Sequence, residues 1–381
     1  MKEKYLKKKC DIVLYTRKEE CCGCSACYAI CPQNAISMNE DEEGFEYPKI
    51  NEDFCISCRK CLSVCPIRDS KRQKNEVEEF RMNCVFCFDN KMFEPACVAI
   101  ASLLDSKNPR EHFDIFCIVD NESLTRKSEL EAIVKRRDEE SVIHVLETPN
   151  DFEGAYEVRG ISRATYTRLL IHRILPQIDK ILYSDVDVLF RGSIKGLWDT
   201  DISDVYFAAV KGTNNFANKW NKYKEYDYFD ELSGLKGQYV NAGIMLMNLA
   251  FIRESGIENE WLERAKRRYE YQDQDILNIT CKDRILHVQL EYNVVAYLVP
   301  KWFKKYYVQN IYSKEEAIRA YHNPIVLHYA GDKPWNNRDT FRGEEWWRYV
   351  LSMDDLSKLF PILKPNYYKR AMFFLKHLFA K

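Results

Sequence analysis

Two aspartates, Asp185 and Asp187, stand one residue apart in the stretch ILYSDVDVLF, residues 181–190. The apolar run before them predicts a buried strand, and in extended chain both carboxylates would point to the same side. Neighbouring carboxylates repel each other, and a divalent cation would relieve that repulsion because hard cations prefer oxygen ligands. The pair therefore predicts a metal site where a strand ends, although a solvated acidic loop or helix caps would use the same residues.

Nine of the 15 cysteines lie between residues 21 and 65, in two copies of the spacing C-x2-C-x2-C-x3-C-P. This spacing is typical of bacterial ferredoxins, in which three cysteines of one copy and the last cysteine of the other hold each 4Fe-4S cluster. Residues 19–68 resemble such a two-cluster ferredoxin. The predicted ligands are Cys21, Cys24, Cys27 and Cys65 for the first cluster, and Cys55, Cys58, Cys61 and Cys31 for the second.

Zinc is the alternative for these cysteines, since C-x2-C is also zinc spacing. Zinc sites usually use two separated pairs, whereas here four cysteines fall within eleven residues, twice, which favours iron–sulfur clusters. Cys22 belongs to neither set. Cys84 and Cys87 form another C-x2-C, in NCVFCF, but that stretch predicts a strand, on which they would face opposite sides as inert buried thiols.

The composition is that of a globular protein of two or three domains, with 381 residues, 46% hydrophobic and 30% charged. A formal net charge of −1 gives no general attraction to nucleic acid, so we expect no nucleic-acid partner. The sequence contains no run of about 18 apolar residues, so we expect no membrane-spanning helix. The basic start lacks an apolar signal core, so we expect a cytoplasmic protein.

From residue 82 onward, short apolar runs alternate with amphipathic helical patterns. This alternation predicts an α/β domain with a mainly parallel sheet and helices on both faces, and ligands in such folds bind beyond the carboxyl ends of the strands. The predicted organisation is a small α+β ferredoxin-like domain at 1–68, a linker at 69–81, the α/β domain at 82–345 and a basic amphipathic helical tail at 346–381.

Five motifs occur in order along the second domain: ATYTRLL, DKILYSDVDVLFRGSIKGLWDTD, YVNAGIMLMNL, YQDQDILN and IVLHYAGDKPW. Together they resemble glycosyltransferase family 8, which includes bacterial lipopolysaccharide galactosyl- and glucosyltransferases, from about Cys84 to Trp335. The resemblance implies a Rossmann-like GT-A fold, a UDP-sugar donor, a manganese ion and retention of the anomeric configuration.

The resemblance assigns Asp185, Asp187 and His328 as manganese ligands. Two carboxylates and an imidazole suit manganese better than magnesium, which agrees with the reading of the aspartates above. Arg168 and Lys333 match basic residues on the phosphate side, where an exposed charge is the alternative for each. Gly331 would let the backbone approach the diphosphate.

On the sugar side, Asn241, Ala242 and Gly243 match a segment that lines the sugar site. Asp273 and Gln274 match a pair beside the donor sugar and, with Arg168, are the predicted catalytic residues. Asp273 would bond sugar hydroxyls and Gln274 would lie near the anomeric carbon. Because an amide is a poor nucleophile, front-face substitution is favoured over double displacement. Alternatively, Asp273 could be a helix cap.

At the nucleotide end, Asp89 matches the acidic residue that reads the uracil edge, and Asn90 is a further predicted contact. The family usually has Asn-Tyr where Lys91 and Met92 stand here, so Phe93 would have to supply the stacking ring.

The tail, residues 367–381, carries basic residues on one helical side and apolar residues on the other. It could lie on an anionic membrane or dock on its own domain.

The resulting hypothesis is a manganese-dependent retaining enzyme that moves glucose or galactose from UDP to a surface-glycan or lipid-linked acceptor. Its iron–sulfur domain would have a redox partner or a docking role. The alternative is an electron-transfer protein whose sugar-nucleotide domain only binds.

Overall fold

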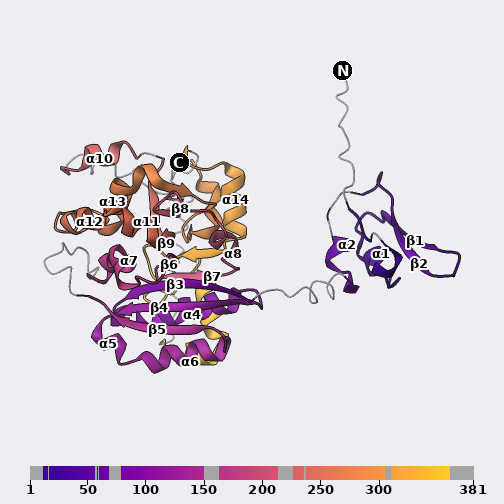
Figure 1. The fold of residues 1–381 in the computed structure, drawn as a ribbon, viewed down its shortest axis with the longest axis horizontal. Coiled ribbons are helices and arrows are strands. Elements are labelled where there is room, and N and C mark those ends of the chain that lie inside the picture. Colours follow the sequence, from indigo (N-terminus) through magenta and orange to yellow (C-terminus); the bar gives the residue numbers. More distant parts are fainter. Residues whose placement is uncertain are drawn as a thin grey trace, which may run out of the picture. The chain divides into compact units, whose positions relative to one another are not determined.

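The computed structural model describes residues 12–15, 17–55, 58, 60–67, 79–149, 163–212, 226–235, 237–304 and 310–360. The chain divides into two compact units, Met1–Glu79 and Phe80–Lys381, which are described separately (Figure 1). Most of the linker predicted at 69–81 and the amphipathic tail at 367–381 lie outside the described residues. Within the described residues, no helix is long and apolar enough to cross a bilayer.

The first unit is small and contains both cysteine repeats. An antiparallel hairpin pairs β1 (Ile36–Glu40) with β2 (Glu46–Ile50). Two short helices, α1 (Ala26–Ile30) and α2 (Lys60–Ser63), contact each other and carry the third cysteine of each repeat. A 3-10 turn, η1 (Lys18–Glu20), precedes the first repeat.

The second unit is built on a seven-stranded sheet of order β10-β8-β9-β6-β3-β4-β5. β9 runs antiparallel to β6 and β8, and the other neighbouring pairs are parallel, which confirms a mainly parallel sheet. The strands are β3 (Phe80–Phe88), β4 (Glu111–Val119), β5 (Val142–Glu147), β6 (Lys180–Ser184), β8 (Phe207–Lys211), β9 (Val240–Asn248) and β10 (Ile285–His287).

Helices cover both faces of this sheet, as predicted. One core contains residues of α4 (Phe93–Ser106), α6 (Lys127–Arg137) and α15 (Gly343–Leu351). The other contains residues of η3 (Arg163–Leu170), α7 (Ile171–Ile174) and α11 to α13. The remaining elements are η2 (Asn90–Met92), α5 (Asn121–Leu124), α8 (Lys195–Trp198), α10 (Phe229–Ser233), α11 (Leu249–Ser255), α12 (Glu258–Ala265), α13 (Gln272–Cys281), η4 (Lys282–Arg284), η5 (Leu290–Tyr292), η6 (Pro300–Trp302), α14 (Lys314–His322) and α16 (Asp354–Ser357).

The alternation of side chains along β3 determines which way the two cysteines of NCVFCF face. Cys84 belongs to one core and Cys87 packs against the other, so they face opposite sides of the sheet as predicted. Burial raises the pKa of Cys87 to about 12 and that of Cys84 well above its usual value. Both thiols are therefore protonated and unreactive at neutral pH.

A second, three-stranded sheet joins segments that are far apart in sequence. Its order is β11-β12-β7, with β7 at Val188–Phe190, β11 at Val294–Val295 and β12 at Val326–His328. β12 runs antiparallel to β7 and places His328 opposite Val188. This register brings the end of β12 beside the two aspartates that follow β6.

Candidate metal and donor site

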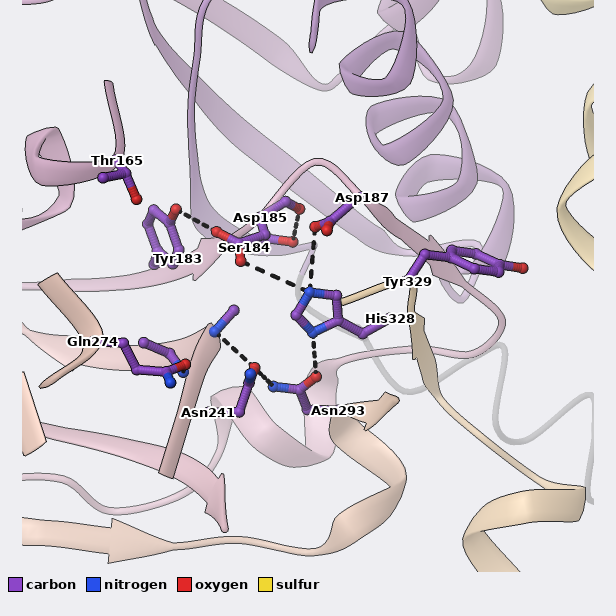
Figure 2. A network of polar contacts seen from close by, with 12 residues as sticks. Thr165, Tyr183, Ser184, Asp185, Asp187, Asn241, Gln274, Asn293, His328 and Tyr329 are labelled. Carbon is purple, nitrogen blue, oxygen red and sulfur yellow. Dashed lines mark hydrogen bonds and ion pairs between the residues drawn. The ribbon is translucent and has the colours of Figure 1, made fainter. Parts of the chain in front are cut away.

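Asp185, Asp187 and His328 converge on one point (Figure 2). The aspartates lie in a bend between β6 and β7, just beyond Ser184, so they follow the end of a strand as predicted. Each of the three residues offers a ligand atom within 4.8 Å of the other two. Nε2 of His328 lies 3.3 Å from Oδ1 of Asp187 and 3.8 Å from Oδ2 of Asp185. The turn thus achieves the convergence that extended backbone was expected to give.

Gly243 provides the space in which these side chains meet. The reversed direction of β9 brings its first residues to the carboxyl end of β6, where the Gly243 carbonyl accepts a 2.7 Å hydrogen bond from the Asp185 N–H. A Cβ on Gly243 would lie 2.9 Å from Oδ2 of Asp185 and 2.9 Å from Nδ1 of His328, closer than real contacts allow. Glycine is therefore required by the close approach of these side chains.

Arg168 is a buried counter-charge for two acids. Its Nη2 donates to Oδ1 of Asp185 at 2.9 Å, and its Nε lies 2.8 Å from Oδ2 of Asp273. Burial opposes the charged guanidinium, but Asp185 and Asp273 outweigh it, so the pKa of Arg168 is raised. Nη1 donates to the Ala242 carbonyl at 2.8 Å, which ties Arg168 to the start of β9.

Lys333 neutralises the second aspartate. Its ammonium contacts Oδ2 of Asp187 and donates to the Tyr329 carbonyl at 2.9 Å. Burial alone would raise the pKa of Asp187, but the Lys333 ammonium holds it well below its usual range. The two aspartates thus have cationic neighbours in space that are distant in sequence.

The remaining donor atoms fit a divalent cation. Oδ1 of Asp185 is occupied by Arg168 and by the Tyr183 hydroxyl, which donates at 2.7 Å. This leaves Oδ2 of Asp185, Oδ1 of Asp187 and Nε2 of His328 facing one another. Two carboxylate oxygens and one imidazole nitrogen form a set that suits manganese and similar ions.

Asp273 and Gln274 lie at the start of α13, beside Arg168 and β9. Oδ1 of Asp273 accepts a 2.9 Å hydrogen bond from Thr165, and burial raises its pKa to about 6. Oε1 of Gln274 accepts from the Ala242 N–H and its Nε2 donates to Tyr239, each at 3.0 Å. The interpretation of Asp273 as a helix cap is wrong, because its carboxylate contacts η3 residues and the N-cap position is Tyr271.

At the nucleotide end, Asp89 follows β3 and accepts from the Lys91 N–H at 3.1 Å, while the Asn90 N–H donates to Asp120 at 3.1 Å. The expectation that Phe93 would stack on a base is wrong. Its ring is fully buried, with the Arg126 guanidinium 3.7 Å from the ring centre.

Gly331 follows β12 and has a φ of 135°, a conformation that favours glycine. An added Cβ there would have no atom within 4 Å, so the backbone at this point borders open space.

Several polar contacts of the site were missed in the sequence. Asn293 accepts from His328, and it is the single residue between η5 and β11, with no recognisable motif around it. Tyr183 lies in the apolar run before the aspartates and was not among the predicted site residues. Its position two residues before Asp185 was an available signal, because residues i and i+2 of a strand share a face.

In the first unit, cysteines line two open hollows, whose empty space together with adjoining solvent is about 420 and 330 Å³. Cys21, Cys24, Cys27 and Cys65 line the larger, and Cys31, Cys55, Cys58 and Cys61 line the smaller, with Cys22 and Cys61 also bordering the larger. Sulfurs around tetrahedral zinc would lie roughly 3.8 Å apart, given Zn–S bonds of about 2.3 Å. In the described part of the chain, no three cysteine sulfurs come within 4.8 Å of one another. The described cysteine sulfurs are therefore not grouped closely enough to share one zinc ion.

Comparison with known proteins agrees with this architecture. Residues 83–339 match the model of glycosyl transferase family 8, and residues 20–69 match a 4Fe-4S dicluster domain. Lipopolysaccharide 1,3-galactosyltransferase of Salmonella typhimurium is 23% identical over 315 residues, 81% of this chain and 88% of its own. Lipopolysaccharide 1,2-glucosyltransferase of Escherichia coli is 27% identical over 197 residues, 50% of this chain and 54% of its own.

Among solved structures, the galactosyltransferase LgtC in complex with donor and acceptor sugar analogs superposes with a TM-score of 0.55 at 26% identity. The match covers 76% of this chain and 99% of LgtC. The second unit therefore has the GT-A fold predicted for it. With the family match spanning most of the second unit, the chain belongs to glycosyl transferase family 8 and is a hexosyltransferase by family, with a 4Fe-4S dicluster domain ahead of its transferase domain.

Proposed function

We propose that the protein transfers glucose or galactose from a UDP-sugar to a surface-glycan or lipid-linked acceptor in the cytoplasm, with manganese as the cation and retention of configuration. One observation carries the proposal: Asp185, Asp187 and His328 meet at the carboxyl end of the sheet, where GT-A folds bind their donor. The acceptor class follows from two relatives whose names specify lipopolysaccharide. The domain limits we propose are 1–68, 69–81, 82–345 and 346–381.

The residues around the cation define the donor side. A divalent cation held by Asp185, Asp187 and His328 would stabilise negative charge on the departing UDP. Lys333, already beside Asp187, would bind the diphosphate as a point charge, and Gly331 would let the backbone come close to it. We assign Asp89 and Asn90 to the uracil end.

The sugar would lie against Asn241, Ala242 and Gly243, with Asp273 near its hydroxyls. Arg168 would hold Asp273 and Asp185 at a fixed separation, since it contacts both carboxylates. Gln274 is held at both ends of its amide, by Ala242 and Tyr239. An amide fixed in this way is a poor nucleophile, which supports front-face substitution with Gln274 orienting the sugar.

The direct test is UDP release from a panel of UDP-sugars, with and without manganese, followed by a screen of lipid-linked glycan acceptors. We expect manganese-stimulated UDP release with UDP-glucose or UDP-galactose. Absence of turnover with every donor and acceptor would contradict the proposal and favour a domain that only binds.

The pKa of Asp273 predicts an acid limit to turnover. Burial raises this pKa to about 6, so the carboxylate that pairs with Arg168 is lost as the pH falls through 6. Turnover at saturating donor should therefore decline below pH about 6, which is about two units above the pKa of an ordinary aspartate. The Thr165 hydroxyl lowers this pKa, so Thr165→Val should move the acid limb to higher pH. Coincident pH–rate profiles for the two proteins would contradict the assignment.

For the first unit we propose two 4Fe-4S clusters, one in each cysteine-lined hollow. The hollows are lined by the two crossed ligand sets that the sequence predicted. Sugar transfer has no net redox change, so the clusters would serve a separate redox partner or a docking role.

Cysteine variants should separate ligands from the spectator Cys22. Anaerobically purified protein should contain about eight iron atoms per chain and absorb broadly near about 400 nm. Cys27→Ser should lose about half of the iron, because one cluster loses a ligand. Cys22→Ser is the matched control and should keep all of it. A colourless protein that holds zinc, or equal iron loss in both variants, would contradict the assignment.

A further inference from the structure

Whether Nε2 of His328 can act as a metal ligand depends on which ring nitrogen carries the hydrogen. A neutral imidazole offers a lone pair at one nitrogen only when the hydrogen is on the other. Nε2 faces Asp185 and Asp187, and Nδ1 lies 2.9 Å from Oδ1 of Asn293. Both His328 and Asn293 are 2% exposed, so water does not easily replace this contact.

The direction of the hydrogen bonds can be followed from the backbone. The Gly243 N–H donates to the side chain of Asn241 at 3.0 Å, and because a backbone N–H can only donate, the acceptor is the amide oxygen. Nδ2 of Asn293 donates to the same oxygen at 2.8 Å (Figure 2). The amide oxygen of Asn293 must then face His328. Because this oxygen can only accept, Nδ1 of His328 must carry the hydrogen and donate it.

We propose that Asn293, oriented by Asn241, is a positioning residue that fixes the Nδ1–H tautomer of His328 and leaves the Nε2 lone pair directed at the two aspartates. The inference deepens the proposed function, because it concerns the same cation site. It also gives the Asn241 side chain a task besides lining the sugar site. Without Asn293, the hydrogen could sit on Nε2 and be donated to Oδ1 of Asp187, which lies 3.3 Å from that nitrogen. In this tautomer Nε2 has no lone pair for a cation.

Two measurements test the proposal without relying on turnover. The first is the histidine tautomer, read from ¹⁵N NMR of metal-free protein labelled at histidine, at a pH where the ring is neutral, with His328 assigned by His328→Gln. The second is Mn²⁺ affinity, read by electron paramagnetic resonance of the free ion. The proteins are wild type, Asn293→Leu, Asn293→Asp and the control Asn83→Leu. Asn83 is a half-buried asparagine whose one described bond is to the Lys180 carbonyl, at the opposite end of β6.

We expect the Nδ1–H tautomer in wild type, in Asn83→Leu and in Asn293→Asp, whose carboxylate still accepts from Nδ1. Asn293→Leu should lose it, and its Mn²⁺ affinity should fall about 10- to 100-fold, the usual effect of removing such a partner. Asn83→Leu should bind Mn²⁺ like wild type.

An Nε2–H tautomer in wild type would overturn the proposal, and so would unchanged tautomer and affinity in Asn293→Leu. The wild-type spectrum decides the matter even if Asn293→Leu does not fold. A failed donor screen would contradict the transferase proposal and leave the tautomer result standing. A wild type that does not bind Mn²⁺ would contradict the cation site, and the tautomer would then show whether Asn293 still orients the ring.

Discussion

Asp187→Asn is expected to lower hexosyl transfer by about 1,000-fold and to abolish its stimulation by manganese. Asp187 supplies one of three ligand atoms, and the Lys333 ammonium beside it holds its pKa well below the usual range. Replacing its carboxylate with an amide removes an anionic ligand while keeping the shape. Loss of metal stabilisation of a leaving group costs several kcal/mol, and about 4 kcal/mol corresponds to this factor. The measurement is UDP release against manganese concentration.

Asp199→Asn is the control for this change. Asp199 is half exposed beyond α8, where it pairs with Lys195 at 2.5 Å, and it lies outside the cation site. The same chemical change should leave turnover and manganese dependence unaltered there. If Asp187→Asn kept wild-type turnover, or lost it without any change in manganese dependence, the cation site would be assigned to the wrong residues.

Gly243→Ala is expected to abolish tight manganese binding and to reduce turnover at least about 100-fold, the usual effect of misplacing a reacting group by about 1 Å. The added methyl would lie 2.9 Å from Oδ2 of Asp185 and from Nδ1 of His328, so one of the two side chains must move. Since Nδ1 also contacts Asn293, a shifted ring loses its orientation as well. Manganese titration and UDP release would both report the change.

Gly234→Ala is the matched glycine control. Gly234 ends α10, has an ordinary helical φ of −70°, and a Cβ there would have no atom within 4 Å. This variant should bind manganese and turn over as wild type does. Thermal unfolding of both proteins would separate a local effect from a loss of fold, and equal activity in the two variants would contradict the role given to Gly243.

The sequence by itself determined the architecture and most of the residues that meet at the site. The alternating runs from β3 to β6 predicted a mainly parallel sheet, because the period of apolar residues reflects which side of each element is buried. The cysteine spacing predicted two crossed ligand sets, and the same two sets line the two hollows. Spacing is informative there because the ligands of one cluster lie on one tight loop.

Only the tertiary structure decided how distant segments combine. The pairing of β7 with β12 sets His328 beside Asp187, 141 positions away in sequence, and the reversed β9 brings Gly243 to Asp185. No local pattern encodes the pairing of Arg168 and Lys333 with the two aspartates. The same holds for the orientation of His328 by Asn293 and for the burial that removes Phe93 from the nucleotide end. Local propensity and period act over a few residues, whereas register and burial are set by the packing of the whole domain.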